Sequence, residues 1–352
     1  MAASSVSAAL PQKIALVRFS ALGDLVMVSA AVRRLQQSLP NAEITWITSP
    51  LGFALLDGMD GVRFEVYEKP RSLADYRTFY RAFRSRRFDL VLAMQANLRI
   101  NLLYPALKAP LKIGFDRTRA REGQWLFCNR RIPFSDDHLV DSFLAFAAEA
   151  GVATAPVEWA LPVSAGERNW AAAQLAAVPR PLIAIHPVAS KAERNWLPER
   201  YRAAMQQAAE RWQAGFVLTG GNSAAERALC AELAASQTGR TLNLCGQTSP
   251  KQLAALLGQA DVLLAPDTGP VHLANAMGTP VVGLYAVASP ALSGPYRRQD
   301  FLVDAYPQAV RQFLHKEPDA LPWNTRVHHP GAMALIGVDA VLAQLARALG
   351  RI

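Results

Sequence analysis

Cysteine is scarce in this chain of 352 residues, and its three cysteines form no C-x-x-C pair. A sparse, odd number suits a reducing cytosol and argues against both a disulfide framework and a zinc site. The six histidines also lack the spacing of metal ligands. We therefore expect neither a disulfide nor a metal site.

Long apolar runs are missing as well. No stretch reaches the roughly 18 uninterrupted apolar residues that a membrane-spanning helix needs. Residues 1–12 have no basic start and no long apolar core, so they do not read as a signal peptide, and we expect a disordered leader there. Any contact with a membrane should then be peripheral.

Acidic residues are fewer than basic ones. The chain has 28 Asp and Glu and 37 Lys and Arg, which gives a net charge of +9. The excess lies in 69–131, where 15 basic residues face 4 acidic ones. A solvated basic face explains this segment, and so does a surface for nucleic acid, an anionic membrane or a phosphorylated substrate. Nucleic acid is disfavoured, since the segment has no recognisable reading motif and no interleaved stacking aromatics.

Strand and helix patterns alternate along the chain, which predicts an α/β fold with parallel sheets covered by helices. A Pro-rich, weakly patterned stretch over 156–167 is the expected linker between two domains, 13–155 and 168–352. A final helix over about 338–350 packs either in its own domain or back on the first. Expected strands cover 13–18, 43–48, 63–68, 88–94 and 111–115, then 181–186, 215–220, 241–245, 261–266 and 279–285. Expected helices cover 25–39, 73–86, 138–151, 197–212, 223–236, 250–259 and 270–277.

Four polar motifs follow expected strands, which is where ligands bind in parallel α/β sheets, in a cleft between two such domains. The first motif runs from Arg18 through Ser20 to Gly23 and Asp24. It lacks the G-x-G-x-x-G of a dinucleotide site, which argues against a nicotinamide enzyme. Asp24 is either a helix N-cap or a carboxylate, kept ionised by the helix dipole, that takes a proton from an attacking hydroxyl.

The second motif is the loop 186–196, which carries the cations Lys191 and Arg194 beside Ser190. A cation next to a departing diphosphate neutralises the charge that builds as the bond breaks. The alternative is a solvated charged loop without a role in binding.

The third motif is the turn at Gly220 and Gly221, with Glu226 on the helix that follows. Glycines let backbone N–H groups face a ligand, and a carboxylate suits ribose hydroxyls. Two glycines before a helix are also often only a turn.

The fourth motif begins Asp267-Thr268-Gly269-Pro270. We expect Pro270 at the first helical position and Gly269 at the N-cap, so that the N–H groups beyond bind phosphate. His272 either contacts the ligand or packs in the core. Asp-Thr-Gly is also the aspartic protease triplet, but that mechanism needs two carboxylates, and this single copy lies in an α/β pattern.

Together the motifs resemble the glycosyltransferase family that contains the lipopolysaccharide heptosyltransferases, over about 13–300. Arg18-x-Ser20-x-x-Gly23-Asp24 is similar to the family's opening motif. Asp267-Thr268-Gly269-x-x-His272-Leu273 with Gly278-x-Pro280 is similar to its strongest motif, and Gly114-Phe115-Asp116-Arg117 to its G-x-x-R.

The resemblance implies a GT-B fold and an inverting, metal-independent enzyme without a cofactor. Its donor would be ADP-L-glycero-β-D-manno-heptose and its acceptor the Kdo or heptose of the inner core on lipid A, whose phosphates would meet 69–131. The protein would be a cytoplasmic monomer or weak oligomer, peripheral at the inner face of the inner membrane. Asp24 would be the general base, with Arg194 or Lys191 at the leaving group. The donor site would comprise Thr268, Gly269, Asp267, His272, Glu226, Ser190, Gly220 and Gly221, and the acceptor site Ser20, Gly23, Arg18, Arg117 and Arg119.

The sequence departs from the family's pattern at two places. The family has Lys-x-Trp-Pro where this chain reads Arg194-Asn195-Trp196-Leu197-Pro198, so Arg194 and Lys191 are rivals. It has Phe-Gly-Pro-Thr where this chain reads Tyr285-Ala286-Val287-Ala288, and 290–335 matches no pattern. One alternative keeps the fold but changes the reaction, to that of a sugar-nucleotide epimerase or hydrolase. Another, from a different class, is a non-catalytic nucleotide-binding or scaffold protein.

Overall fold

The computed structural model describes residues 10–296 and 298–351, which form two compact units. Unit 1 comprises the chain up to Ser20, then 27–135 and 140–160. Unit 2 comprises 21–26, 136–139 and the chain from Leu161 onward, so it includes the first turn of the first helix. Of the expected leader 1–12, residues 1–9 lie outside the described residues.

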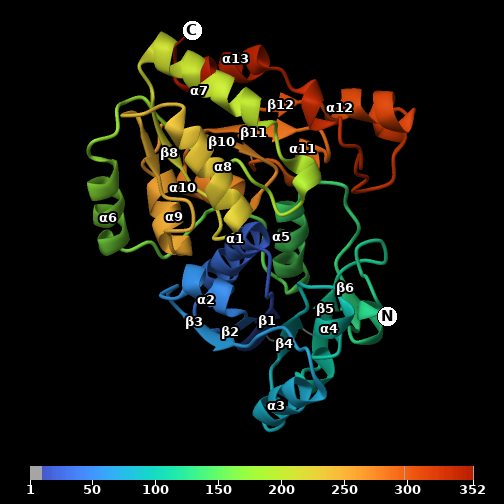
Figure 1. Ribbon diagram of the computed structural model, residues 1–352. Coiled ribbons are helices and arrows are strands. Elements are labelled where there is room, and N and C mark those ends of the chain that lie inside the picture. Colours follow the sequence, from blue (N-terminus) through green and yellow to red (C-terminus); the bar gives the residue numbers. More distant parts are fainter. Residues whose placement is uncertain (1–9, 297, 352) are drawn as a thin grey trace. The chain divides into compact units, whose positions relative to one another are not determined.

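Unit 1 is built on six parallel strands in the order β3-β2-β1-β4-β5-β6 (Figure 1). Residues 14–17 of β1 are fully buried, which explains the continuous apolar run of a strand covered on both faces. The strands are β1 (Lys13–Val17), β2 (Glu43–Thr48), β3 (Val62–Val66), β4 (Leu90–Leu92), β5 (Leu111–Gly114) and β6 (Arg130–Arg131). The helices are α1 (Leu22–Ser38), α2 (Pro50–Leu56), α3 (Leu73–Phe83), α4 (Leu98–Asn101) and α5 (Leu139–Glu149), with 3-10 turns η1 (Tyr104–Ala106) and η2 (Gln124–Leu126).

Alternate residues of β1 face opposite layers of unit 1. Ala15 and Val17 belong to a buried cluster that includes the α3 aromatics Phe79 and Phe83, whose ring centroids lie 4.6 Å apart. This packing fixes the basic helix α3 by its apolar side and leaves its arginines on the outside.

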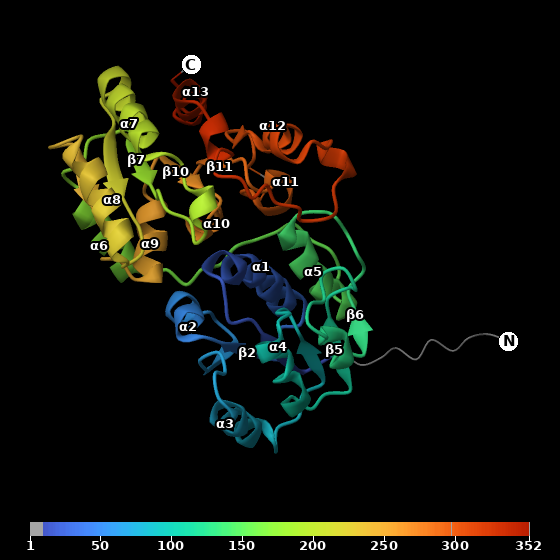
Figure 2. The same cartoon turned by 45° about the vertical axis from the view of Figure 1, so that its right-hand side comes forward.

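Unit 2 contains the second sheet, six parallel strands in the order β12-β11-β10-β7-β8-β9. The last helix, α13, packs against α7 and β11 within this unit, and the two helices lie side by side in both views (Figures 1 and 2). The strands are β7 (Leu182–Ile185), β8 (Gly215–Leu218), β9 (Thr241–Asn243), β10 (Val262–Pro266), β11 (Val281–Tyr285) and β12 (Val303–Asp304). The helices are α6 (Ala165–Leu175), α7 (Pro198–Trp212), α8 (Ala224–Ala235), α9 (Pro250–Leu257), α10 (Gly269–Met277), α11 (Pro290–Ser293), α12 (Tyr306–Ala309) and α13 (Val338–Ala348), with the 3-10 turn η3 (Ala192–Arg194).

The α/β prediction is confirmed, and each expected strand has a counterpart in one of the two sheets. The prediction that the first helix begins near 25 was wrong by three residues. The helix already begins at Leu22, and the Asp24 carboxylate accepts a 2.9 Å hydrogen bond from the Ala21 N–H that precedes it. The stretch 156–167 also runs into a helix, since Ser164 and Glu167 form a capping box that starts α6.

Candidate active site

The Asp-Thr-Gly motif lies at the junction of β10 and α10 in unit 2. Thr268 is the N-cap, with extended backbone angles, so Gly269 and Pro270 are the first two helical residues. The expected cap at Gly269 was therefore wrong by one residue, because the Val271 N–H closes the first turn on the Thr268 carbonyl at 3.1 Å. Helix N-termini carry partial positive charge, and this one is at the carboxyl end of a central strand. It can therefore receive an anion.

A cation from the second motif is held beside this helix terminus. The Arg194 Nη1 lies 3.1 Å from the Asp267 Oδ2, and each side chain is only 13% exposed. Burial raises the pKa of Asp267, an effect that Arg194 and Arg326 oppose and Asp24 reinforces. The pair is thus a partly desolvated ion pair, whose guanidinium is in place for an anion at the start of α10.

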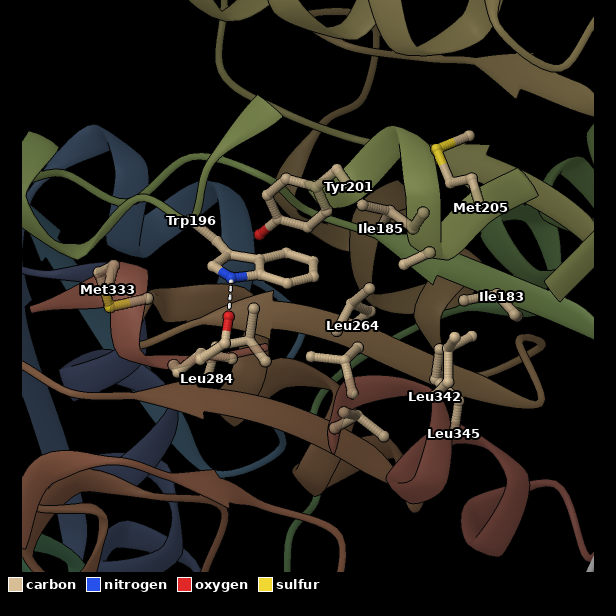
Figure 3. Packing of buried hydrophobic residues seen from close by; sticks show 14 of the residues in the cluster. Ile183, Ile185, Trp196, Tyr201, Met205, Leu264, Leu284, Met333, Leu342 and Leu345 are labelled. Carbon is tan, nitrogen blue, oxygen red and sulfur yellow. Dashed lines mark hydrogen bonds between the residues drawn. The ribbon is translucent and has the colours of Figure 1, made fainter. Parts of the chain in front are cut away.

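The loop that carries Arg194 is anchored on both sides. The Asn195 Oδ1 accepts a 2.7 Å hydrogen bond from the Ala189 N–H, which closes the loop on itself. Trp196 is 1% exposed, donates its indole N–H to the Ile336 carbonyl at 3.0 Å and packs edge-on against Tyr201 (Figure 3). By contrast Lys191 and Ser190 are exposed. The fold therefore positions Arg194 far more tightly than its rival Lys191.

Two glycines of the predicted site meet inside unit 2. A Cβ on Gly23 would lie 2.5 Å from the His272 Cδ2, and a Cβ on Gly269 would lie 3.2 Å from the Gly23 nitrogen. A side chain at Gly23 is thus excluded for steric reasons, and one at Gly269 would require its neighbours to shift by a few tenths of an ångström. Their contact brings the first turn of α1, with Asp24, to the N-terminus of α10.

His272 is 6% exposed, and its environment argues for a neutral ring. Its pKa is lowered to about 4, mainly by burial and also by the neighbouring His138, while Asp24 acts in the opposite direction. The His138 Nε2 lies 2.9 Å from the Gly294 carbonyl oxygen, and its ring is tilted against the Tyr296 ring, with the centroids 5.1 Å apart. His272 is therefore a packed, uncharged neighbour of Asp24.

The Gly220–Gly221 turn is shaped by what surrounds it. A Cβ on Gly220 would lie 2.6 Å from the Cys245 sulfur, and one on Gly221 would lie 2.7 Å from the Glu226 Oε2. Glu226 accepts hydrogen bonds from the Gly221 N–H at 3.1 Å and the Ser223 hydroxyl at 2.6 Å, and it completes the capping box of α8. Burial raises the pKa of Glu226, but these hydrogen bonds outweigh burial and leave it below its usual value. An ionised carboxylate thus stands at this turn.

The predicted acceptor residues Arg18 and Ser20 lie in unit 1, after β1. The Arg18 Nη1 donates to the Met94 carbonyl at 2.6 Å, and the guanidinium lies over the Phe143 ring. The Lys69 ammonium donates to the Ser20 hydroxyl. Lys69, the first basic residue of the segment 69–131, therefore contacts the loop that follows β1.

The two predicted arginines after β5 differ in environment. Arg119 is 5% exposed, pairs with Asp116 and donates to the Ser142 hydroxyl and to the Pro133 carbonyl. Arg117, two residues earlier, is exposed. Arg119 thus braces this loop, whereas Arg117 is accessible to a ligand.

Residues of the segment 290–335 interact with the loop 186–196, which was not predicted from the sequence. The His328 Nδ1 lies 3.0 Å from the Glu193 carboxylate, and Arg326 acts electrostatically on both Glu193 and Asp267. The Val327 N–H is fixed to the Val287 carbonyl at 2.9 Å, directly after β11. Because 290–335 matches no family pattern, this interaction could not be predicted from the sequence.

Residues 10–296 and 298–351 contain neither a candidate metal cluster nor a candidate membrane-spanning helix. Nowhere in these ranges do three or more His, Cys, Asp or Glu side chains form a group that could hold a metal ion. None of the helices in these ranges is long and apolar enough to cross a membrane. A surface hollow of about 810 Å³ lies between α7 and the segment 236–240 that follows α8, but the residues that line it belong to none of the four motifs.

Two parallel α/β units, the second of which places Arg194 and Asp24 near the N-terminus of α10, match the GT-B class of glycosyltransferases. Residues 76–318 match the family described as glycosyltransferase family 9 (heptosyltransferase). The chain is 34% identical, over 337 residues, to the lipopolysaccharide core heptosyltransferase OpsX of Haemophilus influenzae, covering 95% of this chain and 96% of that protein. The chain therefore belongs to glycosyltransferase family 9.

Solved structures support the same fold. A family 9 glycosyl transferase from Veillonella parvula superposes with a TM-score of 0.81 at 17% identity, covering 97% of this chain and 98% of that one. The Escherichia coli ADP-heptose lipopolysaccharide heptosyltransferase II superposes with a TM-score of 0.75 at 21% identity, covering 96% and 99%. The expected GT-B fold and the expected enzyme class are confirmed.

Proposed function

We propose that this enzyme transfers heptose from ADP-heptose to the inner core of lipopolysaccharide, with Kdo or heptose on lipid A as the acceptor. The observation that carries the proposal is the relation to a lipopolysaccharide core heptosyltransferase over nearly the full length of both chains. ADP-heptose as donor is supported by the name of the Escherichia coli relative. No protein cofactor enters the reaction.

The donor diphosphate binds at the N-terminus of α10, on Thr268 and Gly269. Support comes from the helix terminus itself and from the guanidinium of Arg194, fixed 3.1 Å from Asp267. Arg194 neutralises the ADP that departs, whereas the exposed Lys191 contributes less. The remaining donor contacts are assigned to the ribose and sugar, from Glu226, Gly220, Gly221, Ser190 and Asp267, whereas the buried His272 packs beside Asp24.

Asp24 acts as the general base. An acceptor hydroxyl attacks the anomeric carbon from the face opposite the diphosphate, its proton passes to Asp24, and the electron pair of the broken bond leaves with ADP. The β-linked donor thus gives an α-linked product. The reaction runs without a metal ion, because Arg194 and the helix terminus supply the positive charge that the leaving group requires.

The acceptor is assigned to unit 1 and the adjoining turn, through Arg18, Ser20, Gly23 and Arg117, with Arg119 bracing the loop after β5. The basic segment 69–131 suits the phosphates and carboxylates of a lipid A core. The enzyme works at the cytoplasmic face of the inner membrane, as a monomer or weak oligomer.

The test is a transfer assay with the purified enzyme. ADP-heptose, UDP-glucose and GDP-mannose are each offered with a heptose-free Kdo–lipid A acceptor and with a one-heptose acceptor, in the presence and absence of EDTA. Mass spectrometry should show addition of one heptose from the ADP donor alone, with EDTA making no difference. Release of free sugar at the same rate without acceptor would identify a hydrolase instead, and an epimerised donor would identify an epimerase.

A further inference from the structure

Large apolar side chains are unevenly exposed on this protein. Among residues 10–296 and 298–351, all eleven exposed ones lie between Leu10 and Phe134, and none lies in unit 2. Six of the eleven fall within the basic segment 69–131: Leu73, Tyr80, Leu98, Leu102, Trp125 and Leu126. Apolar exposure and positive charge therefore coincide in one part of the chain.

Two of these six residues, including the most exposed of them, stand on an anchored turn. Gln124 is completely buried and donates to the carbonyls of Ala93 at 2.8 Å and Gln95 at 3.1 Å. The next two residues, Trp125 and Leu126, are 45% and 75% exposed. The buried Gln124 thus anchors η2, and the side chains of Trp125 and Leu126 are exposed to solvent beside it.

Hydrogen bonds join this turn to α4. The buried Asn101 side chain donates to the carbonyls of Arg121 and Glu122, both at 3.0 Å. Leu98 and Leu102, at either end of α4, are 52% and 39% exposed. The exposed apolar residues of η2 and α4 therefore belong to one continuous structure.

Hydrogen bonds also join α3 to α4, and both helices carry exposed arginines. The Tyr80 hydroxyl donates to the Leu102 carbonyl at 2.9 Å, and the Tyr76 hydroxyl to the Arg99 carbonyl at 3.1 Å. Arg86, Arg119 and Arg130 of the basic segment form ion pairs with carboxylates. Other arginines are exposed on α3, α4 and the turn before η2, namely Arg77, Arg81, Arg84, Arg99 and Arg121.

We infer that α3, α4 and η2 form a docking surface for an anionic lipid bilayer, with Trp125 and Leu126 entering the headgroup region. The inference deepens the proposed function, on which it rests for a membrane-borne acceptor. Tryptophan and leucine on a fixed turn gain from burial at the boundary between headgroups and acyl chains, and nearby arginines gain from anionic headgroups. Charge complementarity selects a bilayer over a second copy of this chain, because two copies would bring their basic segments together.

The experiment is flotation of the full-length enzyme with vesicles that contain no lipopolysaccharide. Phosphatidylcholine vesicles are compared with vesicles that also contain phosphatidylglycerol. Wild-type protein should bind the anionic vesicles, and added salt should weaken the binding. The double variant Trp125→Ser/Leu126→Ser should bind them about tenfold more weakly or worse, and Arg99→Gln/Arg121→Gln should lose mainly the anionic preference.

The matched control is Leu51→Ser. Leu51 is as exposed as Trp125, at 45%, but lies on α2, which connects β2 and β3 at the opposite edge of the sheet from β5 and β6. This control should bind vesicles like wild type, and circular dichroism should show all variants folded. A second readout is transfer to a water-soluble, deacylated acceptor, which should be unchanged in Trp125→Ser/Leu126→Ser.

Three outcomes would overturn the inference: no binding of the wild type to anionic vesicles, equal binding by the η2 double variant, or equal loss in Leu51→Ser. If the wild type fails to bind the anionic vesicles, a further arm adds lipopolysaccharide to them, and binding only in that arm would reassign the surface to the acceptor. Failure of the proposed transfer reaction would leave vesicle binding unaffected, so the two proposals fail separately.

Discussion

At the scale of single residues, Arg194 and Lys191 show how the fold separates two cations that the sequence leaves equivalent. Three residues apart, one is paired with Asp267 at 13% exposure and the other is exposed at the start of η3. A cation in a partly desolvated, fixed position stabilises developing charge more than a mobile one in water. Arg194 is therefore the leaving-group cation in our account.

Replacing each cation in turn tests this assignment. Arg194→Ala should lower kcat by about 100-fold, the loss expected for one positioned charge-stabilising donor, whereas Lys191→Ala should stay within a few fold. Arg194→Lys controls for the unpaired Asp267 that the alanine variant leaves buried. Steady-state kinetics with ADP-heptose measures the effect, and the reverse order of losses would make Lys191 the cation.

At the scale of secondary-structure elements, one carboxylate at the start of α8 has two roles. Glu226 caps the helix with Ser223 and also stands at the Gly220–Gly221 turn assigned to the ribose. Capping alone would explain the residue type. Only a pair of variants can separate the cap from the ligand contact.

Ser223→Ala and Glu226→Gln form that pair. Ser223→Ala should lower the stability of the folded state by about 1 kcal/mol and leave ADP affinity unchanged. Glu226→Gln keeps a residue that a capping box accepts, yet should weaken ADP binding about tenfold, because a charged hydrogen bond to the ribose is lost. Thermal melts and calorimetric titration give the two values, and unchanged ADP affinity in Glu226→Gln would leave the residue as a cap only.

Elements with strong periodicity could be predicted from the sequence, and weak or long-range features could not. The strands β1, β2 and β10 could be predicted from their apolar runs. A parallel strand buried on both faces is apolar along its whole length, and this pattern is visible in the sequence alone. Short α4 and the two-residue strands β6 and β12 carry too little pattern. The same limit holds for sites, because the influence of Arg326 on Asp267 joins residues 59 positions apart.

At the scale of the whole molecule, buried histidines couple stability to pH. Burial lowers the pKa of both His186 and His272 to about 4. In the unfolded chain these rings take up a proton near pH 6.5. The folded state keeps both rings neutral. Their contribution to the stability of the folded state is therefore fully present above about pH 6.5, and it is lost as pH falls from about 6.5 toward about 4.

His186→Gln should make the protein less sensitive to acid. The wild type should lose about 1.4 kcal/mol of stability per pH unit from this one ring over that window, and the variant should not. His186 lies 3.0 Å from the Thr219 hydroxyl, a contact that glutamine can retain. Denaturation curves of both proteins at about pH 7 and about pH 5 measure the difference, and an equal loss in both would contradict the assigned pKa.

Asp24 is the residue on which the transferase account depends. Asp24→Asn keeps the size of the side chain and an oxygen that can accept the Ala21 N–H, but it removes the base. The most direct measurement is heptose transfer by wild type and Asp24→Asn, with ADP-heptose affinity determined in parallel. The account predicts a loss in turnover of about 100-fold or more, with affinity within a few fold of wild type. Full turnover by Asp24→Asn would contradict it.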